Sequence, residues 1–177
     1  MAHKKKLTKF FSIIRDNETI QQEFFEIEKI ILRIHTFHDL ISTLLKVMKN
    51  QFALHHVGIT FLKGKYAEEF GLEDFCKRSG KLCNFLDRSF LYKSFIKDSK
   101  PKLENKNIEK WADFFPKKIL QTTGSVSVIP LKIDKKVIGT LNLSDSSTKR
   151  YDPARDTQFL ERLAIIVSIS IDNVIHH

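Results

Sequence analysis

Residues 124–144, Gly-Ser-Val-Ser-Val-Ile-Pro-Leu-Lys-Ile-Asp-Lys-Lys-Val-Ile-Gly-Thr-Leu-Asn-Leu-Ser, carry the clearest fold signal in the chain. Two stretches rich in β-branched and apolar residues, 125–133 and 137–144, flank the polar turn Asp134-Lys135-Lys136. This pattern predicts a β-hairpin. Pro130 cannot donate a ladder hydrogen bond, so we expect it at a sheet edge or a bulge, and Gly139 allows another backbone to come close.

A long closing helix is predicted after the hairpin. Asp152-Pro153 is typical of a helix start, because Asp is a good N-cap and Pro is tolerated at the first helical position. The helix would run to about Ile175 with apolar residues at helical spacing. These residues are Phe159, Leu160, Leu163, Ile166, Val167 and Ile171.

The beginning of the chain is a basic segment, 1–16, which we expect to be a partly ordered leader. From a cap at Asn17, residues 17–35 and 37–52 are predicted to be helical. The first of these helices has apolar residues at steps of 4, 3, 4 and 3, the a/d spacing of a coiled coil. They are Ile20, Phe24, Ile27, Ile31 and Ile34.

This spacing predicts a homodimer formed by the segment 17–52 together with the closing helix. The interface residues that we expect are Ile20, Phe24, Ile27, Ile31, Ile34, Leu163, Ile166 and Val167. Phe25 and Ile30 lie off the seam, so the helix has more apolar surface than one stripe requires and would pack on its own domain and on a second chain. An ordinary core helix without a partner chain remains the alternative.

The middle of the chain predicts shorter elements. Val57, Ile59 and Phe61 alternate within 56–62, which indicates a strand. The secondary structure of the stretch 71–86 is ambiguous from the sequence. The other expected elements are a second strand at 65–70, a helix from Asp87 to about Lys97, a short strand at 102–104 and a helix from Ile108 to Phe115.

Length and charge indicate the class of protein. A chain of 177 residues can bury a core as one domain without a metal or a disulfide. The net charge is +9, but the lysines are scattered, so we predict no specific nucleic-acid interface, and weak attraction for anionic ligands or membranes stays open. No apolar run approaches the ~18 residues of a membrane span, and no secretory signal is apparent, so we expect a cytoplasmic protein.

The residues that could carry chemistry form no known catalytic pattern. Cys76 and Cys83 are expected to be reduced thiols, and no CxxC motif is present. His35 and His38 could share a helix face but lack a third ligand, so no metal site and no cofactor are predicted. A thiol-dependent redox activity stays open, because basic residues such as Lys77 lie near in sequence and could favour a thiolate.

Three segments together resemble the C-terminal half of a GAF domain: residues 126–133, residues 136–143 and Tyr151-Asp-Pro-Ala-Arg-Asp-Thr-Gln-Phe-Leu-Glu-Arg-Leu163. The resemblance is closest to a bacterial GAF-like branch in which a long helix precedes the domain. It implies an α+β, profilin-like fold with a central antiparallel sheet, both terminal helices on one face and a pocket on the other, under the middle segment. The chain would comprise the leader 1–16, the dimerising helices 17–52 and a GAF-like domain 53–177.

The same resemblance implies a non-catalytic sensory or regulatory module that binds a small molecule. GAF domains elsewhere bind cyclic nucleotides, bilins, haem or small metabolites, and the segments typical of cyclic-nucleotide and bilin sites do not occur here. The candidate pocket residues are Phe85, Phe90, Tyr92, Trp111, Phe114, Thr122, Ser125, Ser127 and Asn142. Two alternatives remain: a dimerisation scaffold without a ligand, and a thiol enzyme similar to the GAF-fold methionine sulfoxide reductases.

Overall fold

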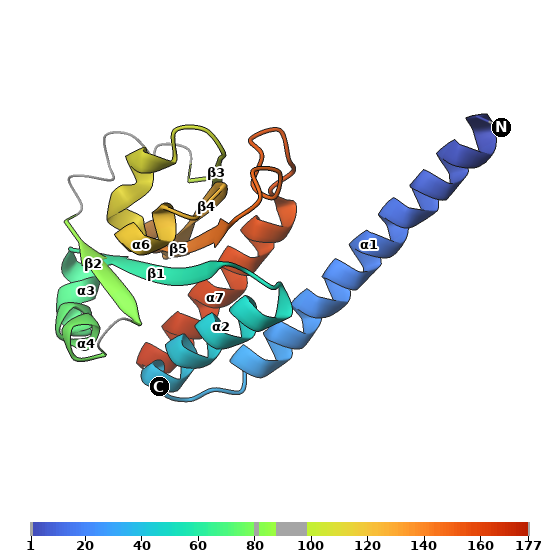
Figure 1. Cartoon of the computed structure of the whole chain (residues 1–177). Helices are drawn as coiled ribbons and strands as arrows, with labels where there is room; N and C mark the ends of the chain where they lie inside the picture. Colours follow the sequence, from blue (N-terminus) through green and yellow to red (C-terminus); the bar gives the residue numbers. More distant parts are fainter. Residues whose placement is uncertain (1, 80–81, 88–98, 177) are drawn as a thin grey trace.

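The computed structural model describes residues 2–79, 82–87 and 99–176, with side chains from Asn17 onward. A central sheet separates a layer of long helices from a layer of short helical turns (Figure 1). The elements are α1 (Ala2–Ile31), α2 (Phe37–Gln51), β1 (His56–Leu62), α3 (Lys65–Glu69), α4 (Leu72–Arg78), β2 (Cys83–Leu86), β3 (Lys102–Glu104), the 3-10 helix η1 (Ile108–Phe114), α6 (Lys117–Leu120), β4 (Ser125–Ile133), β5 (Lys136–Asp145) and α7 (Gln158–His176).

The sheet has five strands in the order β2-β1-β5-β4-β3. The predicted hairpin is β4–β5, and its turn consists of Asp134 and Lys135, both with positive φ, as a two-residue hairpin turn requires. One edge differs from the expected antiparallel sheet, because β2 runs parallel to β1. The connection between them carries α3 and α4, and such a crossover is what parallel pairing needs.

Pro130 and Gly139 lie where the hairpin tolerates or needs them. β3 pairs only with Val126–Val128 of β4, so Pro130 lies beyond the end of that edge strand, and the β4–β5 register shifts just after it. A Cβ atom at Gly139 would clash with the carbonyl oxygen of Thr60 on β1. Both expectations from the hairpin sequence are confirmed.

The long helices α2 and α7 cover one face of the sheet, and the second half of α1 packs on these two helices. Thr36 caps α2 by accepting the Asp39 N–H at 3.2 Å, and α2 then buries an apolar stripe against the sheet. The largest fully buried side chains of this core include Leu40, Ile41, Leu44, Met48, Ile59, Phe61, Ile129 and Leu131. Each such side chain contributes roughly 1.5–3 kcal/mol by leaving water, so this face holds most of the apolar core.

A smaller apolar cluster lies on the opposite face, under η1 and α6. Phe114 and Phe115 pack there against Leu62, Val126 and Val128. Pro116 follows directly and caps α6, so the expected helix from Ile108 is confirmed as a 3-10 helix that ends before the proline. The expected helix from Asp87 to Lys97 lies, apart from Asp87, outside the described residues, as do Phe90 and Tyr92.

Helix α1 differs from the prediction at its start. It begins at Ala2, so residues 2–16 are helical backbone and not a partly ordered leader, and Asn17 lies inside the helix instead of capping it. The first half of α1 extends away from the rest of the chain, while its second half runs beside α2 (Figure 1). The helix therefore extends further toward the N-terminus than the cap-like Asn17 indicated.

Two other predicted boundaries are wrong. Residues 65–70, expected as a strand, form α3, which places the Tyr66 and Phe70 rings one turn apart at 4.8 Å. Helix α7 begins at Gln158 and not at Asp152-Pro153. Asp152 instead accepts a hydrogen bond from the Asn105 amide at 3.1 Å and stabilises the preceding turn.

The expected dimer ridge is also corrected. Phe24, Ile27, Ile31, Leu163 and Val167 are all buried within their own chain. Ile20, Ile34 and Ile166 are partly buried and pack against the same core. A helix that packs on neighbouring helices shows the same spacing as a coiled-coil strand, so the 4-3 pattern could not distinguish the two.

Candidate functional site

The predicted pocket residues do not come together, because the sheet separates them. Ser125 and Ser127 pair with Asp145 and Leu143 on the face that α7 covers, whereas Asn142 projects from the opposite face. Phe85 packs with the helix-side core. Trp111 and Phe114 belong to the η1 side, and Thr122 bonds His55 at 2.8 Å.

Asn142 is the centre of a closed polar cluster under η1. Its amide nitrogen donates to Thr60 Oγ1 at 2.8 Å and to the Phe114 carbonyl at 3.4 Å, and its carbonyl oxygen accepts from Thr140 Oγ1 at 2.8 Å. All three side chains of this cluster are fully buried. Since these groups satisfy one another, the cluster fastens η1 to the sheet and does not present Asn142 to a ligand.

A cavity of about 370 Å³ lies at the junction of the three long helices. Its helical lining comprises Ile20 and Phe24 of α1, Met48 of α2 with Phe52 at the end of that helix, and Phe159 and Leu163 of α7. Leu103 of β3 and Leu143 of β5 form the side toward the sheet. This cavity includes none of the nine predicted pocket residues, and it lies on the opposite face of the sheet from η1.

Three aromatic rings form one wall of this helix-junction cavity. The Phe24 ring lies 5.5 Å from the Phe159 ring in a stacked arrangement and 5.2 Å from the Phe52 ring in a tilted one. Such pairs are favourable beyond the area they bury. The wall therefore joins α1, α2 and α7 through side chains that also face the cavity.

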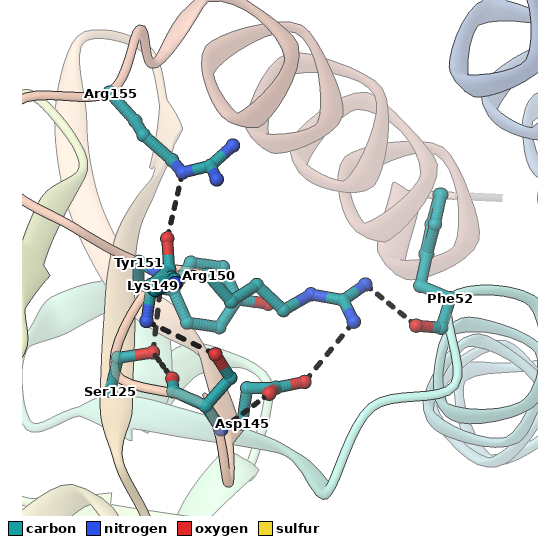
Figure 2. A network of polar contacts seen from close by, with 8 residues as sticks. Phe52, Ser125, Asp145, Lys149, Arg150, Tyr151 and Arg155 are labelled. Carbon is teal, nitrogen blue, oxygen red and sulfur yellow. Dashed lines mark hydrogen bonds and ion pairs between the residues drawn. The ribbon is translucent and has the colours of Figure 1, made fainter. Parts of the chain in front are cut away.

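Arg150 holds the loop that lines one side of the cavity (Figure 2). Its Nη2 donates to the Phe52 carbonyl at 2.6 Å, and its Nη1 pairs with Asp145 Oδ2 at 3.1 Å. Ser125 Oγ donates to the Ser147 carbonyl at 2.6 Å and accepts the Tyr151 N–H at 3.1 Å. The loop is thus bonded to both the sheet and the end of α2.

The polar groups of the cavity differ in whether they are already paired. Tyr151 is almost completely buried, and this burial raises the pKa of its phenol, so the group is an uncharged hydroxyl. Arg155 donates from Nε to the Lys149 carbonyl at 2.8 Å, and its terminal nitrogens bond nothing within the described part of the chain. Glu23, across the cavity on α1, also has no bonded partner among the described residues.

Cys76 and Cys83 form a disulfide with Cα atoms 5.2 Å apart, which corrects the expected free thiols. Cys76 lies in α4 and Cys83 begins β2, and the pairing of β2 beside β1 places the two residues next to each other. The sequence pattern predicted neither α4 nor β2. Within the described ranges, no group of three His, Cys, Asp or Glu residues could hold a metal ion. In the same ranges, no helix has both the length and the apolar character of a bilayer-crossing segment.

Comparisons with known proteins agree with this architecture. A family model described as "Protein of unknown function, DUF484" matches residues 1–175. A search of curated proteins gives no match. Among solved structures, a free methionine-R-sulfoxide reductase from Neisseria meningitidis in complex with its substrate has a TM-score of 0.57 at 15% identity, over 88% of this chain and 89% of its own.

A GAF domain assigned to a sensor histidine kinase from Pseudomonas syringae pv. tomato is similarly close, with a TM-score of 0.56 at 13% identity over 92% of this chain and 93% of its own. At these identities the likeness concerns the fold alone. The expected GAF-like α+β fold is confirmed, with a mixed sheet in place of a purely antiparallel one.

Proposed function

We propose that this chain, which belongs to the DUF484 family, is a non-catalytic sensory or regulatory module that works as a homodimer and responds to a small molecule. The form of α1 is the observation that carries this proposal. Phe24, Ile27 and Ile31 fasten its second half into the core, while its first half extends away from the rest of the chain (Figure 1). A helix anchored in this way can pass a change within the domain to whatever its free end contacts.

Exposed apolar side chains on α1 and α7 support the homodimer. Large exposed apolar groups mark interaction surfaces when they gather on adjoining elements. The two helices adjoin, because Arg162 Nε of α7 bonds Glu28 Oε1 of α1 at 2.8 Å. The exposed residues are Phe25 and Ile30 of α1, Leu32 directly after it, and Ile165 and Ile169 of α7. A second copy would offer the same surface and bury it by two-fold symmetry.

Light scattering coupled to size exclusion tests the homodimer. Wild type should elute with the mass of two chains, and the double substitution Ile165→Asp and Ile169→Asp should yield the mass of one chain. Asn173→Asp adds a negative charge at another exposed position of α7 and should leave the dimer intact. A wild type that stays monomeric at micromolar concentration, or a double variant that stays dimeric, would contradict the proposal.

A thiol-dependent reductase is a second candidate, favoured by the Cys76–Cys83 disulfide in a fold shared with a methionine sulfoxide reductase. Two thiols and methionine sulfoxide would give the disulfide, methionine and water, so an external thiol reductant must restore the thiols. Methionine formation from free methionine sulfoxide with dithiothreitol measures this activity. The pair Cys76→Ser and Cys83→Ser should abolish it, and a rate unchanged by that pair would exclude this candidate.

A further inference from the structure

The helix-junction cavity is built from groups that suit one class of ligand. From its lining we infer that it binds a small hydrophobic carboxylate, with the apolar part against Phe24, Phe52 and Phe159 and the carboxylate on Arg155. This inference rests on the proposed regulatory function and names the ligand of that function. The site lies on the helix side of the sheet, away from η1.

The size and lining of the cavity favour a small molecule. Ligand sites have volumes of about 300–1,000 Å³ and are mostly apolar with a few placed polar groups. The cavity has about 370 Å³, and its interior consists of aromatic and aliphatic side chains from helices and strands that the core holds in place. An aromatic or short aliphatic body would complete the ring wall that Phe24 makes with its neighbours.

The carboxylate is assigned from the charges at the opening. Arg150 is already bonded to Asp145 and to the Phe52 carbonyl, and Asp156 accepts the first N–H of α7 at 2.9 Å. Arg155 is different, because only its Nε is engaged within the described residues. Its two terminal nitrogens form a donor fork that matches a carboxylate.

Glu23 of α1 is the second charged group of the cavity that has no bonded partner among the described residues. Glu23 could hold an ammonium group, so the ligand is either a simple acid or a hydrophobic amino acid.

Occupancy of the cavity would act directly on α1. Ile20, Glu23 and Phe24 lie on that helix, whose first half extends away from the rest of the chain (Figure 1). A ligand that binds Phe24 and its aromatic neighbours would stiffen the base of α1 against α2 and α7. That link joins recognition to the proposed dimer surface.

Isothermal titration calorimetry with four related probes tests the inference. 3-Phenylpropionate has the carboxylate alone, L-phenylalanine has both charges, phenethylamine has the ammonium alone and 3-phenylpropanamide is uncharged. We expect the two carboxylates to bind the full chain at least about tenfold more tightly than the amine and the amide, because one charge-assisted contact is lost. An amine or amide that binds as tightly as the acids would overturn the carboxylate assignment, and no binding by any probe would overturn the site.

Substitutions in the cavity test where the probes bind and which of the two ligand classes the site prefers. Arg155→Gln should weaken both acids about tenfold or more. Arg78→Gln, whose Nε likewise bonds a backbone carbonyl but on α4, should not. Leu160→Trp should fill the cavity and abolish binding. If Glu23→Gln binds L-phenylalanine more weakly than wild type and 3-phenylpropionate equally well, the ligand class is a hydrophobic amino acid. If it binds both probes as tightly as wild type or more tightly, the ligand class is a simple acid.

Equal affinity of wild type and Arg155→Gln would overturn the contact, and unchanged affinity in Leu160→Trp would overturn the location. Calorimetry measures the affinity for the probes, and light scattering measures the mass of the assembly. Either the ligand inference or the dimer proposal can therefore fail without the other. A dimer that binds none of the probes would be the ligand-free scaffold.

Discussion

Arg150 joins two parts of the chain that are 98 positions apart, because its Nη2 donates a 2.6 Å hydrogen bond to the carbonyl oxygen of Phe52. The same guanidinium pairs with Asp145 at the end of β5. One side chain therefore positions the end of α2, the end of the hairpin and the loop that lines one side of the helix-junction cavity (Figure 2).

Arg150→Gln should lower the free energy of unfolding by about 1–3 kcal/mol, because a nearly buried Asp145 and the Phe52 carbonyl lose their donor. Chemical denaturation measures this loss. Arg162→Gln breaks the more exposed pair with Glu28 and should cost at most about 1 kcal/mol. Equal losses for the two variants would show that the Arg150 contacts add nothing beyond a surface ion pair.

Ala53→Gly should raise the free energy of unfolding by about 0.5–1 kcal/mol. Ala53 has a φ of 48° where the chain leaves α2, and Leu54 N–H bonds the Lys49 carbonyl there, as in a helix end that usually carries Gly. Thermal and urea unfolding measure the change. Ala67→Gly inside α3 should act in the opposite direction, and a destabilising Ala53→Gly would mean that the left-handed conformation is not strained.

Gly139→Ala should destabilise the sheet by about 1–3 kcal/mol, since its Cβ atom would meet the Thr60 carbonyl of the neighbouring strand. Urea unfolding at constant pH measures the loss. Gly71 provides the contrast, because its φ is 61° but no atom lies within 4 Å of an added Cβ. Gly71→Ala should cost only about 1 kcal/mol, from backbone strain alone, and an equal or larger loss there would argue against the clash at Gly139.

The sequence predicted most of the fold because several signals are local. The β4–β5 hairpin, β1, β3 and α2 follow from alternation, helical spacing and turn residues that lie within each segment. The errors concern choices that depend on the rest of the chain. Residues 65–70 could alternate as a strand or place Tyr66 and Phe70 on one helix face, and only the core beside them decides.

The candidate site was not predictable in the same way. The predicted pocket residues come from the hairpin and the middle segment, but alternate residues of β4 and β5 face opposite sides of the sheet. The cavity instead combines Phe24, Phe52 and Phe159 with Arg155, and no local pattern shows that these positions meet. The apolar spacing of α1 predicts a buried stripe, but it does not indicate whether its own chain or a second one covers that stripe.

Replacing His56 with Phe should reduce the loss of stability in mild acid. Burial first, and then the nearby Lys49 and His55, lower the pKa of His56 below its usual 6.5 in the folded chain. The unfolded chain therefore takes up this proton more readily, and the stability present above pH 6.5 declines as pH falls from there toward the lowered pKa. Urea unfolding from pH 7.5 to 5 measures the slope, with the exposed His35→Phe as control; an unchanged slope in His56→Phe would contradict the assignment.

Reduction of the Cys76–Cys83 disulfide should lower the free energy of unfolding by about 2–3 kcal/mol, because the bond closes a short loop and limits the unfolded chain. Denaturation with and without a reductant measures this difference, and mass spectrometry after alkylation measures the number of free thiols. The double variant Cys76→Ser and Cys83→Ser should unfold identically with and without the reductant. Wild type that carries two alkylated cysteines before reduction, after purification in air, would show that the pair is not bonded in solution and would restore the free thiols expected from the sequence.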